Sequence, residues 1–140
     1  MRSGTWLFLT CFLAGSALIT GLWSWPAYKN YQQSKSGQRA AELGAQLAFT
    51  ENSYRARTGT FTDDFSQLAP LLESSVPCPL TKSPYFCEGY IYTLEAPHWL
   101  VAVSREDENI YLAFDLEQGS VDCTHALEAL QRTPVCSAFN

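Results

Sequence analysis

Residues 27–57 read AYKNYQQSKSGQRAAELGAQLAFTENSYRAR and contain no proline. Many of these residues are good helix formers, while Gly37 and Gly44 weaken the pattern locally. Apolar side chains recur at helical spacing with small residues between them: Ala40, Leu43, Leu47 and Tyr54, interleaved with Ala41, Ala45 and Ala48. The pattern predicts an amphipathic helix whose apolar stripe must pack against another element.

A long uncharged run precedes this helix. Residues 6–25 read WLFLTCFLAGSALITGLWSW, and the nearest basic side chains on either side are Arg2 and Lys29. A helix of this length spans about 30 Å, the thickness of the hydrocarbon core of a bilayer. Aromatic residues near both ends are typical of membrane–water interfaces. We therefore expect a transmembrane helix over residues 5–28, preceded by a short basic leader-like segment, residues 1–4.

A cleaved secretory signal is the alternative interpretation of this run. The apolar region of a signal peptide is normally about 7–15 residues long, which is shorter than the run. The residues after it, Trp23 to Pro26, make a poor cleavage site. An uncleaved anchor is therefore favoured. Pro26 does not have to end the helix, because a proline can form a kink within a long one. One helix that continues to about residue 57 is expected.

The segment 58–89 is expected to be a loop that contains one short helix. Gly59 stands where a left-handed residue would end the long helix. Asp63 and Asp64 offer an N-cap for a short helix over FSQLAPLL, residues 65–72. Three prolines and two cysteines then follow, which indicates a loop pinned by a local disulfide.

The region 90–140 is expected to hold a sheet and a C-terminal disulfide region. Three short runs rich in aromatic and β-branched residues predict strands: 90–94, 99–103 and 111–116. The polar run 105–109 predicts a hairpin turn, and residues 121–123 allow a stub of a fourth strand. Residues 125–132 predict a short helix that ends at Pro134. The predicted fold class is α+β, with a long N-terminal helix packed on a small antiparallel sheet of three to four strands.

Charge is unevenly distributed along the chain, whose net charge is −5. Residues 1–57 hold six basic and two acidic side chains (+4), whereas residues 58–140 hold three basic and twelve acidic ones (−9). A nucleic-acid-binding domain would be basic, so this distribution argues against nucleic acid as a partner. Neither a G-x-S-x-G motif nor a glycine-rich phosphate loop is present. We therefore predict no enzyme and no cofactor.

Four of the five cysteines lie in the acidic half: Cys78, Cys87, Cys123 and Cys136. An even number of cysteines in a small domain behind a membrane segment indicates two disulfides and an oxidising compartment. Their spacing does not match the tight knuckles of metal sites. Four cysteines allow three connectivities. We favour Cys78–Cys87 and Cys123–Cys136, because each pair closes a short loop.

The titratable residues give little sign of a ligand site. His98 and His125 belong to no metal-binding pattern, and His98 is expected at the rim of a strand. Acidic residues cluster twice: Glu106, Asp107 and Glu108, then Asp115, Glu117 and Asp122. The spacing of a calcium-binding EF-hand loop is absent, so solvated turns are favoured over a metal site.

In their order along the chain, these features resemble a type IV pilin or pseudopilin. Residues 25–31 (WPAYKNY) are similar to the proline-small-tyrosine step that ends the membrane part of the helix in that family. Residues 53–64 (SYRARTGTFTDD) are similar to the end of its outer half. Residues 87–90 and 111–115 resemble parts of the sheet of small pilins. The resemblance covers nearly the whole chain and rests on the order of several weak motifs.

The register of this resemblance places a prepilin peptidase cleavage site between Gly4 and Thr5. In the family a glycine precedes the cut, and the helix proline is the twenty-second mature residue, which here is Pro26. The first mature residue is usually phenylalanine or methionine, where this chain has Thr5. The fifth is usually a glutamate that pairs with a neighbouring subunit, where this chain has Leu9. Leu9 therefore indicates a minor subunit or a relative that does not assemble.

The resemblance implies a structural or assembly role, as a minor subunit of a type IV pilus or of a type II secretion-like pseudopilus. The helix packing and assembly residues would be Leu9, Gly15, Gly21 and Pro26, of which the two glycines are small positions that allow close helix approach. The implied partners are other pilin-like subunits, an inner-membrane assembly platform and, if the leader is cut, prepilin peptidase.

The implied location is the bacterial inner membrane, crossed once, with residues 29–140 in the periplasm or on an extracellular filament. The alternative function is a membrane-anchored periplasmic binding module with a pilin-like fold that does not assemble. The sequence leaves open whether such a system serves motility, adhesion, DNA uptake or secretion.

Overall fold

The computed structural model describes residues 3–137, and within residues 3–23 it describes the backbone but only some of the side chains. The chain divides into two compact units, Met1–Gln33 and Ser34–Asn140. The long helix α1 (Ser3–Thr58) belongs to the first unit up to Gln33 and to the second from Ser34 onward.

The helix α1 is continuous, as the sequence predicted. Pro26 lies inside it and does not end it. The helix ends at Thr58, and the next residue, Gly59, has a φ of 89°. The N–H of Gly59 donates to the carbonyl oxygen of Arg55 at 2.7 Å. This is the left-handed C-terminal cap expected at Gly59.

Among the residues that the structure describes, no helical segment is both long and apolar enough to cross a membrane. Many side chains of residues 5–28 lie outside the described set, so the transmembrane helix expected there stays a prediction.

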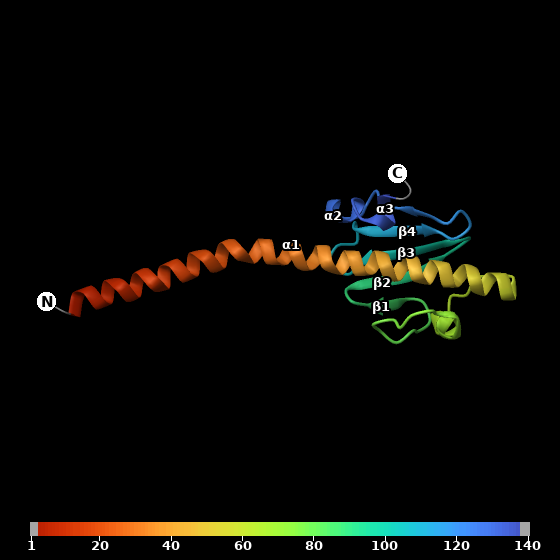
Figure 1. The fold of residues 1–140 in the computed structure, drawn as a ribbon, viewed down its shortest axis with the longest axis horizontal. Helices are drawn as coiled ribbons and strands as arrows, with labels where there is room; N and C mark the ends of the chain where they lie inside the picture. Colours follow the sequence, from red (N-terminus) through yellow and green to blue (C-terminus); the bar gives the residue numbers. More distant parts are fainter. Residues whose placement is uncertain (1–2, 138–140) are drawn as a thin grey trace. The chain divides into compact units, whose positions relative to one another are not determined.

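An antiparallel sheet follows α1 (Figure 1). Its five strands are β1 (Tyr85–Cys87), β2 (Tyr90–Glu95), β3 (Trp99–Ser104), β4 (Tyr111–Asp115) and β5 (Ser120–Asp122). Their spatial order is β1-β2-β3-β4-β5, so every strand pairs with its neighbour in the sequence. Three short helices complete the fold: the 3₁₀ helix η1 (Phe65–Leu71), α2 (Glu128–Gln131) and α3 (Pro134–Ser137).

Most predicted elements outside α1 are confirmed. The helix η1 begins after Asp64, whose carboxylate accepts the N–H of Ser66 at 3.1 Å. The strands β2, β3 and β4 coincide with the three predicted runs to within one residue at each end. The turn between β3 and β4 contains the polar run 105–109.

Two predictions are wrong. The sheet has five strands instead of three to four, because β1 lies inside the segment expected to be a loop. Its three residues follow a proline-rich stretch and are too few to show strand alternation, whereas a two-residue turn pairs them with β2. The helix expected over 125–132 is only the four-residue α2, and Pro134 begins a second helical turn. Proline suits that first position because its missing N–H would have no helical partner there.

The second half of α1 covers one face of the sheet (Figure 1). Alternate side chains of the central strands point to this face and are buried: Tyr92, Leu100, Ala102, Leu112 and Phe114. The predicted stripe of α1 meets them, with Ala40, Ala41, Leu43 and Leu47 buried and Ala45, Ala48 and Tyr54 partly buried. Burial of these side chains supplies the hydrophobic stabilisation of the Ser34–Asn140 unit.

Two glycines allow α1 to approach its neighbours closely. A Cβ at Gly44 would lie 2.4 Å from Cε2 of Phe114, and a Cβ at Gly37 would lie 2.4 Å from Cδ1 of Leu130. Contacts this short are not tolerated, so any side chain there would displace its neighbour. The two glycines that weaken the helical pattern in the sequence are therefore positions of contact with β4 and α2.

We expect Gly44→Ala to lower the free energy of unfolding by about 1–3 kcal/mol, because the ring of Phe114 is buried and cannot move freely. Thermal unfolding followed by circular dichroism in detergent measures the effect. Gly21→Ala is the matched control, since no described atom outside the adjoining helix backbone lies within 4 Å of its Cβ position and alanine favours a helix. Equal stability of the two variants would contradict the close approach at Gly44.

Candidate functional site

Large apolar side chains are exposed on α1 within the Met1–Gln33 unit. They occur at every third residue, with exposed fractions of 59% to 74%: Leu22, Trp25, Tyr28 and Tyr31. We call these four residues the aromatic segment. A three-residue step is less than one helical turn, so the four side chains spread around the helix instead of forming one line. Exposed apolar surface of this kind marks a site of contact with another protein or with lipid.

The predicted assembly residues lie in the same unit. At Gly15 and Gly21, no described atom outside the adjoining helix backbone lies within 4 Å of the position that a Cβ would occupy. Neither glycine is therefore in close contact with another described part of the chain. The side chains of Thr5 and Leu9 lie outside the described set, so the cleavage after Gly4 and the role of Leu9 stay predictions.

Both favoured disulfides are confirmed. Cys78 bonds to Cys87 and Cys123 bonds to Cys136, with Cα–Cα separations of 5.7 Å and 5.8 Å. The first disulfide joins the loop before β1 to the last residue of β1. The second joins the segment after β5 to α3 and so holds the C-terminal helical turn near the sheet.

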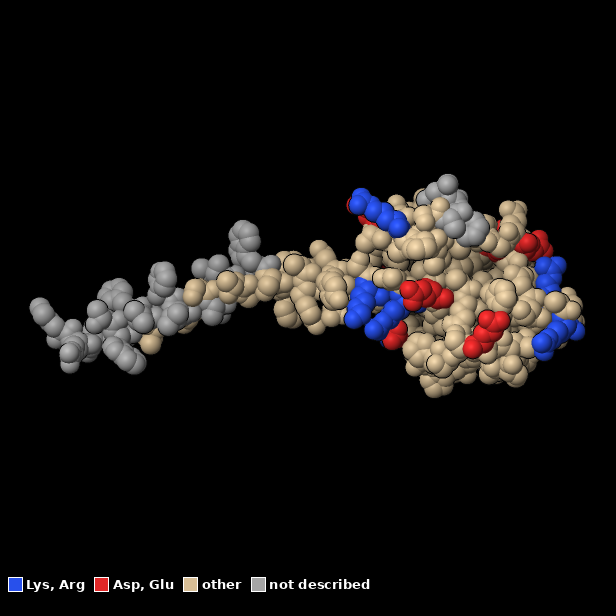
Figure 2. Space-filling model, viewed as in Figure 1, with Lys and Arg blue, Asp and Glu red and all other residues tan. Residues whose placement is uncertain are grey.

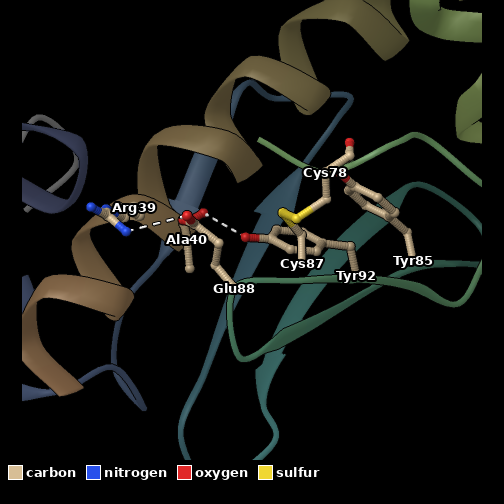
Figure 3. Close-up of a disulfide and its surroundings, with 7 residues drawn as sticks. All are labelled: Arg39, Ala40, Cys78, Tyr85, Cys87, Glu88 and Tyr92. Carbon is tan, nitrogen blue, oxygen red and sulfur yellow. Dashed lines mark hydrogen bonds and ion pairs between the residues drawn. A yellow bond between two sulfur atoms is a disulfide. The ribbon is translucent and has the colours of Figure 1, made fainter. Parts of the chain in front are cut away.

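The hairpin of β1 and β2 is attached to α1 beside the first disulfide (Figure 3). Glu88, in the tight turn next to Cys87, accepts a hydrogen bond from the guanidinium of Arg39 at 3.2 Å. The hydroxyl of the buried Tyr92 donates to the carbonyl oxygen of Ala40 at 3.5 Å. The hydroxyl of Tyr85 donates to the carbonyl oxygen of Cys78 at 2.8 Å. The bonds from Arg39 and to Ala40 join the hairpin to the helix, while the disulfide and the Tyr85 bond join the loop at Cys78 to β1.

A mostly apolar groove of about 290 Å³ lies within the Ser34–Asn140 unit, where α1, the β4–β5 turn and α3 meet. We call it the α1–α3 groove. Its apolar lining comes from all three elements: Ala45, Ala48 and Phe49 of α1, Phe114 and Val121 of the sheet, and Pro134 and Val135 of α3. Phe49 is 63% exposed, unlike the buried Leu43 and Leu47 on the same helix. The groove is thus an apolar surface that the fold leaves open.

Glu51 is a fully buried carboxyl group on the core face of α1. Its Oε2 accepts the N–H of Thr62 at 3.1 Å, whereas Oε1 has no hydrogen-bond partner among the described residues. Desolvation raises the pKa of Glu51 from 4.5 to about 7; the Thr62 N–H opposes this shift, and the nearby carboxylate of Asp63 adds to it. In the folded protein this carboxyl group is therefore partly protonated near neutral pH.

The two histidines make contacts with neighbouring side chains in the fold. His98 lies between two carboxylates, with Nε2 3.6 Å from Asp115 and Nδ1 3.7 Å from Glu117. His98 is only partly exposed, at the turn before β3, as expected for a rim position. The ring of His125 stacks on Tyr111 at a centroid distance of 4.6 Å.

The acidic residues serve as turn residues in the described structure. Asp115 accepts the N–H groups of Glu117 and Gln118, and Asp107 accepts the N–H of Asn109. Among the described residues, no group of three or more histidine, cysteine, aspartate or glutamate side chains is placed to hold a metal ion. Figure 2 shows basic and acidic side chains scattered over the face drawn, without a continuous basic patch.

Comparison of the chain with protein-family models, with curated proteins and with solved structures gave no match. The pilin-like family assignment therefore rests on the sequence features and stays a prediction.

Two features of the site were missed at the sequence level. Glu51 follows Leu47 by four residues and precedes Tyr54 by three, so the helical period already placed this carboxyl on the buried stripe. The α1–α3 groove had no such signal. Its lining comes from three segments that are distant in sequence, and only the fold brings Phe49, Val121 and Val135 together.

We expect Glu51→Gln to stabilise the protein at pH 8 and to have little effect at pH 5. The pKa of Glu51 is raised in the folded state, so between about pH 4.5 and pH 7 the folded chain binds more protons than the unfolded chain. The free energy of unfolding of the parent protein therefore falls as pH rises through this window, by up to about 3 kcal/mol. Glutamine keeps an oxygen for the Thr62 N–H and does not ionise.

Urea unfolding at pH 5, 6, 7 and 8 measures this difference. Glu42→Gln is the matched control, because Glu42 is an exposed glutamate on the same helix. Parallel pH profiles for the parent protein and Glu51→Gln would contradict the raised pKa of Glu51.

Proposed function

We propose that this protein is a structural subunit of a filament of the type IV pilus or type II secretion pseudopilus kind, of the minor class. The observation that carries the proposal is the aromatic segment, Leu22 to Tyr31, which exposes large apolar side chains on a helix. Neighbouring helices or lipid can bury such a surface and remove its apolar side chains from water. In a filament of this kind, subunit helices bundle and bury surfaces like this one.

The position of the aromatic segment within α1 supports the same role. The described residues of the first unit, Ser3 to Gln33, are all helical, whereas the second half of α1 packs against the sheet. The Ser34–Asn140 unit thus has its own packed core, whereas the first unit exposes the large apolar side chains of the aromatic segment. The two disulfides support an oxidising location for the folded part.

Leu9 is compatible with both the minor-subunit proposal and its alternative, a tethered binding module that does not assemble; cleavage between Gly4 and Thr5 is what distinguishes them. A carboxylate in a membrane is stable only when it is paired, so a subunit that has leucine there lacks one contact that would fix its position in a filament. Assembly of this chain therefore depends more strongly on other helix contacts, and the aromatic segment is the strongest candidate among the described residues.

The proposal predicts that the protein, extracted from its native membrane in mild detergent, co-purifies with pilin-like subunits. Trp25→Ala combined with Tyr28→Ala is expected to reduce this recovery severalfold, because large aromatic side chains dominate helix and interface contacts. Phe86→Ala is the matched control, since Phe86 is an exposed aromatic residue on β1, in the other unit.

The intact mass of the purified protein provides a second readout. Loss of residues 1–4 is expected if prepilin peptidase processes the chain. A full-length chain recovered only as an isolated membrane monomer, in cells that make such filaments, would contradict the proposal and favour the tethered binding module.

A further inference from the structure

The α1–α3 groove is an apolar surface without a partner in the described part of the chain. Its walls come from α1, the β4–β5 turn and α3, with Phe49 exposed at its side. Leu43 and Leu47, the leucines of the same half of α1, are buried in the core. An exposed phenylalanine beside an apolar groove marks a contact site, because burial of both in a partner removes apolar surface from water.

The same chain carries an exposed surface of matching chemistry. The aromatic segment exposes Trp25 and Tyr28, which are three residues apart and are neighbours on the helix surface. A groove of about 290 Å³ accommodates a single large aromatic side chain, and such rings favour apolar walls with a polar rim. Asn52 and Ser120 supply polar groups at the groove that can meet a tyrosine hydroxyl or an indole N–H.

Charge favours contact between these two surfaces. Lys29 directly follows Tyr28 and is exposed, and residues 1–33 contain two basic side chains, Arg2 and Lys29, and no acidic one. Asp115 lines the groove, and the exposed Asp122 directly follows the groove-lining Val121. The nearby Glu117 is already paired with Arg55 at 3.8 Å. Hydrogen bonds from Thr124 lower the pKa of Asp122, so this carboxylate stays ionised well below neutral pH. Lys29 and these carboxylates carry opposite charges, which favours contact between the two surfaces.

We propose that the α1–α3 groove binds the aromatic segment of a second copy of this chain, with Trp25 as the residue that enters it. This inference rests on the proposed assembly function and adds a specific contact to it. The two surfaces are different patches of the molecule, so each copy offers one of each, and the contact is heterologous and can repeat from copy to copy. Such a contact gives a chain with Leu9 a means of self-association that needs no membrane carboxylate.

Site-specific photo-cross-linking of the full-length protein in its native membrane tests the contact. The photoreactive residue is introduced as Phe49→p-benzoylphenylalanine, and cross-linked peptides are identified by mass spectrometry. The matched control is Phe86→p-benzoylphenylalanine, because Phe86 is an exposed phenylalanine on β1 that does not line the groove. The expected product from position 49 is a covalent dimer joined to the peptide that contains residues 22–31, and this product is absent from position 86.

Adding Trp25→Ala to the position 49 variant is expected to reduce the yield of this dimer about tenfold, as for the loss of one well-buried aromatic anchor. Cross-links from position 49 to a different part of a second copy, or to another pilin-like subunit, would overturn the groove contact and leave the assembly function standing. Cross-links only to lipid, or none to any protein from either position, would overturn both.

Discussion

The close approach of α1 to the sheet at Gly44 is the contact on which the rest of the Ser34–Asn140 unit depends. Because Gly44 has no side chain, the ring of Phe114 can lie against the helix backbone. The same approach brings Ala40 within reach of the Tyr92 hydroxyl and Arg39 within reach of Glu88. It also encloses Glu51 in the core, where its Oε2 accepts the Thr62 N–H and its Oε1 has no hydrogen-bond partner among the described residues. A wider spacing would weaken all of these contacts together.

The two halves of α1 then have different physical roles. From Ser34 onward the apolar stripe of the helix packs against the sheet. Phe49 is an exposed apolar side chain in this half. Before Gln33 the large apolar side chains of the aromatic segment are exposed. A protein built in this way has a stable folded part and a helix that needs external partners, which is the physical basis of the proposed filament role.

Much of this fold could be predicted from the sequence because it depends on local signals. The end of α1 at Gly59, the cap of η1 at Asp64 and the three central strands follow from caps, turns and periodicity. The disulfide pairing followed from short loop closure alone. The strand β1 could not be predicted, since three residues after a proline-rich stretch carry no pattern and are fixed only by pairing with β2. The groove depends on tertiary packing of three distant segments, which no local pattern encodes.

The division of α1 is tested most directly by comparing the full chain with a truncated chain of residues 34–140. If the second half of α1 belongs to the folded part and the first half serves only external contacts, the truncated chain should be an oxidised monomer that unfolds in one cooperative transition. The full chain in detergent should associate with itself under the same conditions. Sedimentation velocity and thermal unfolding measure both properties. A truncated chain that fails to fold, or that associates as strongly as the full chain, would contradict this division.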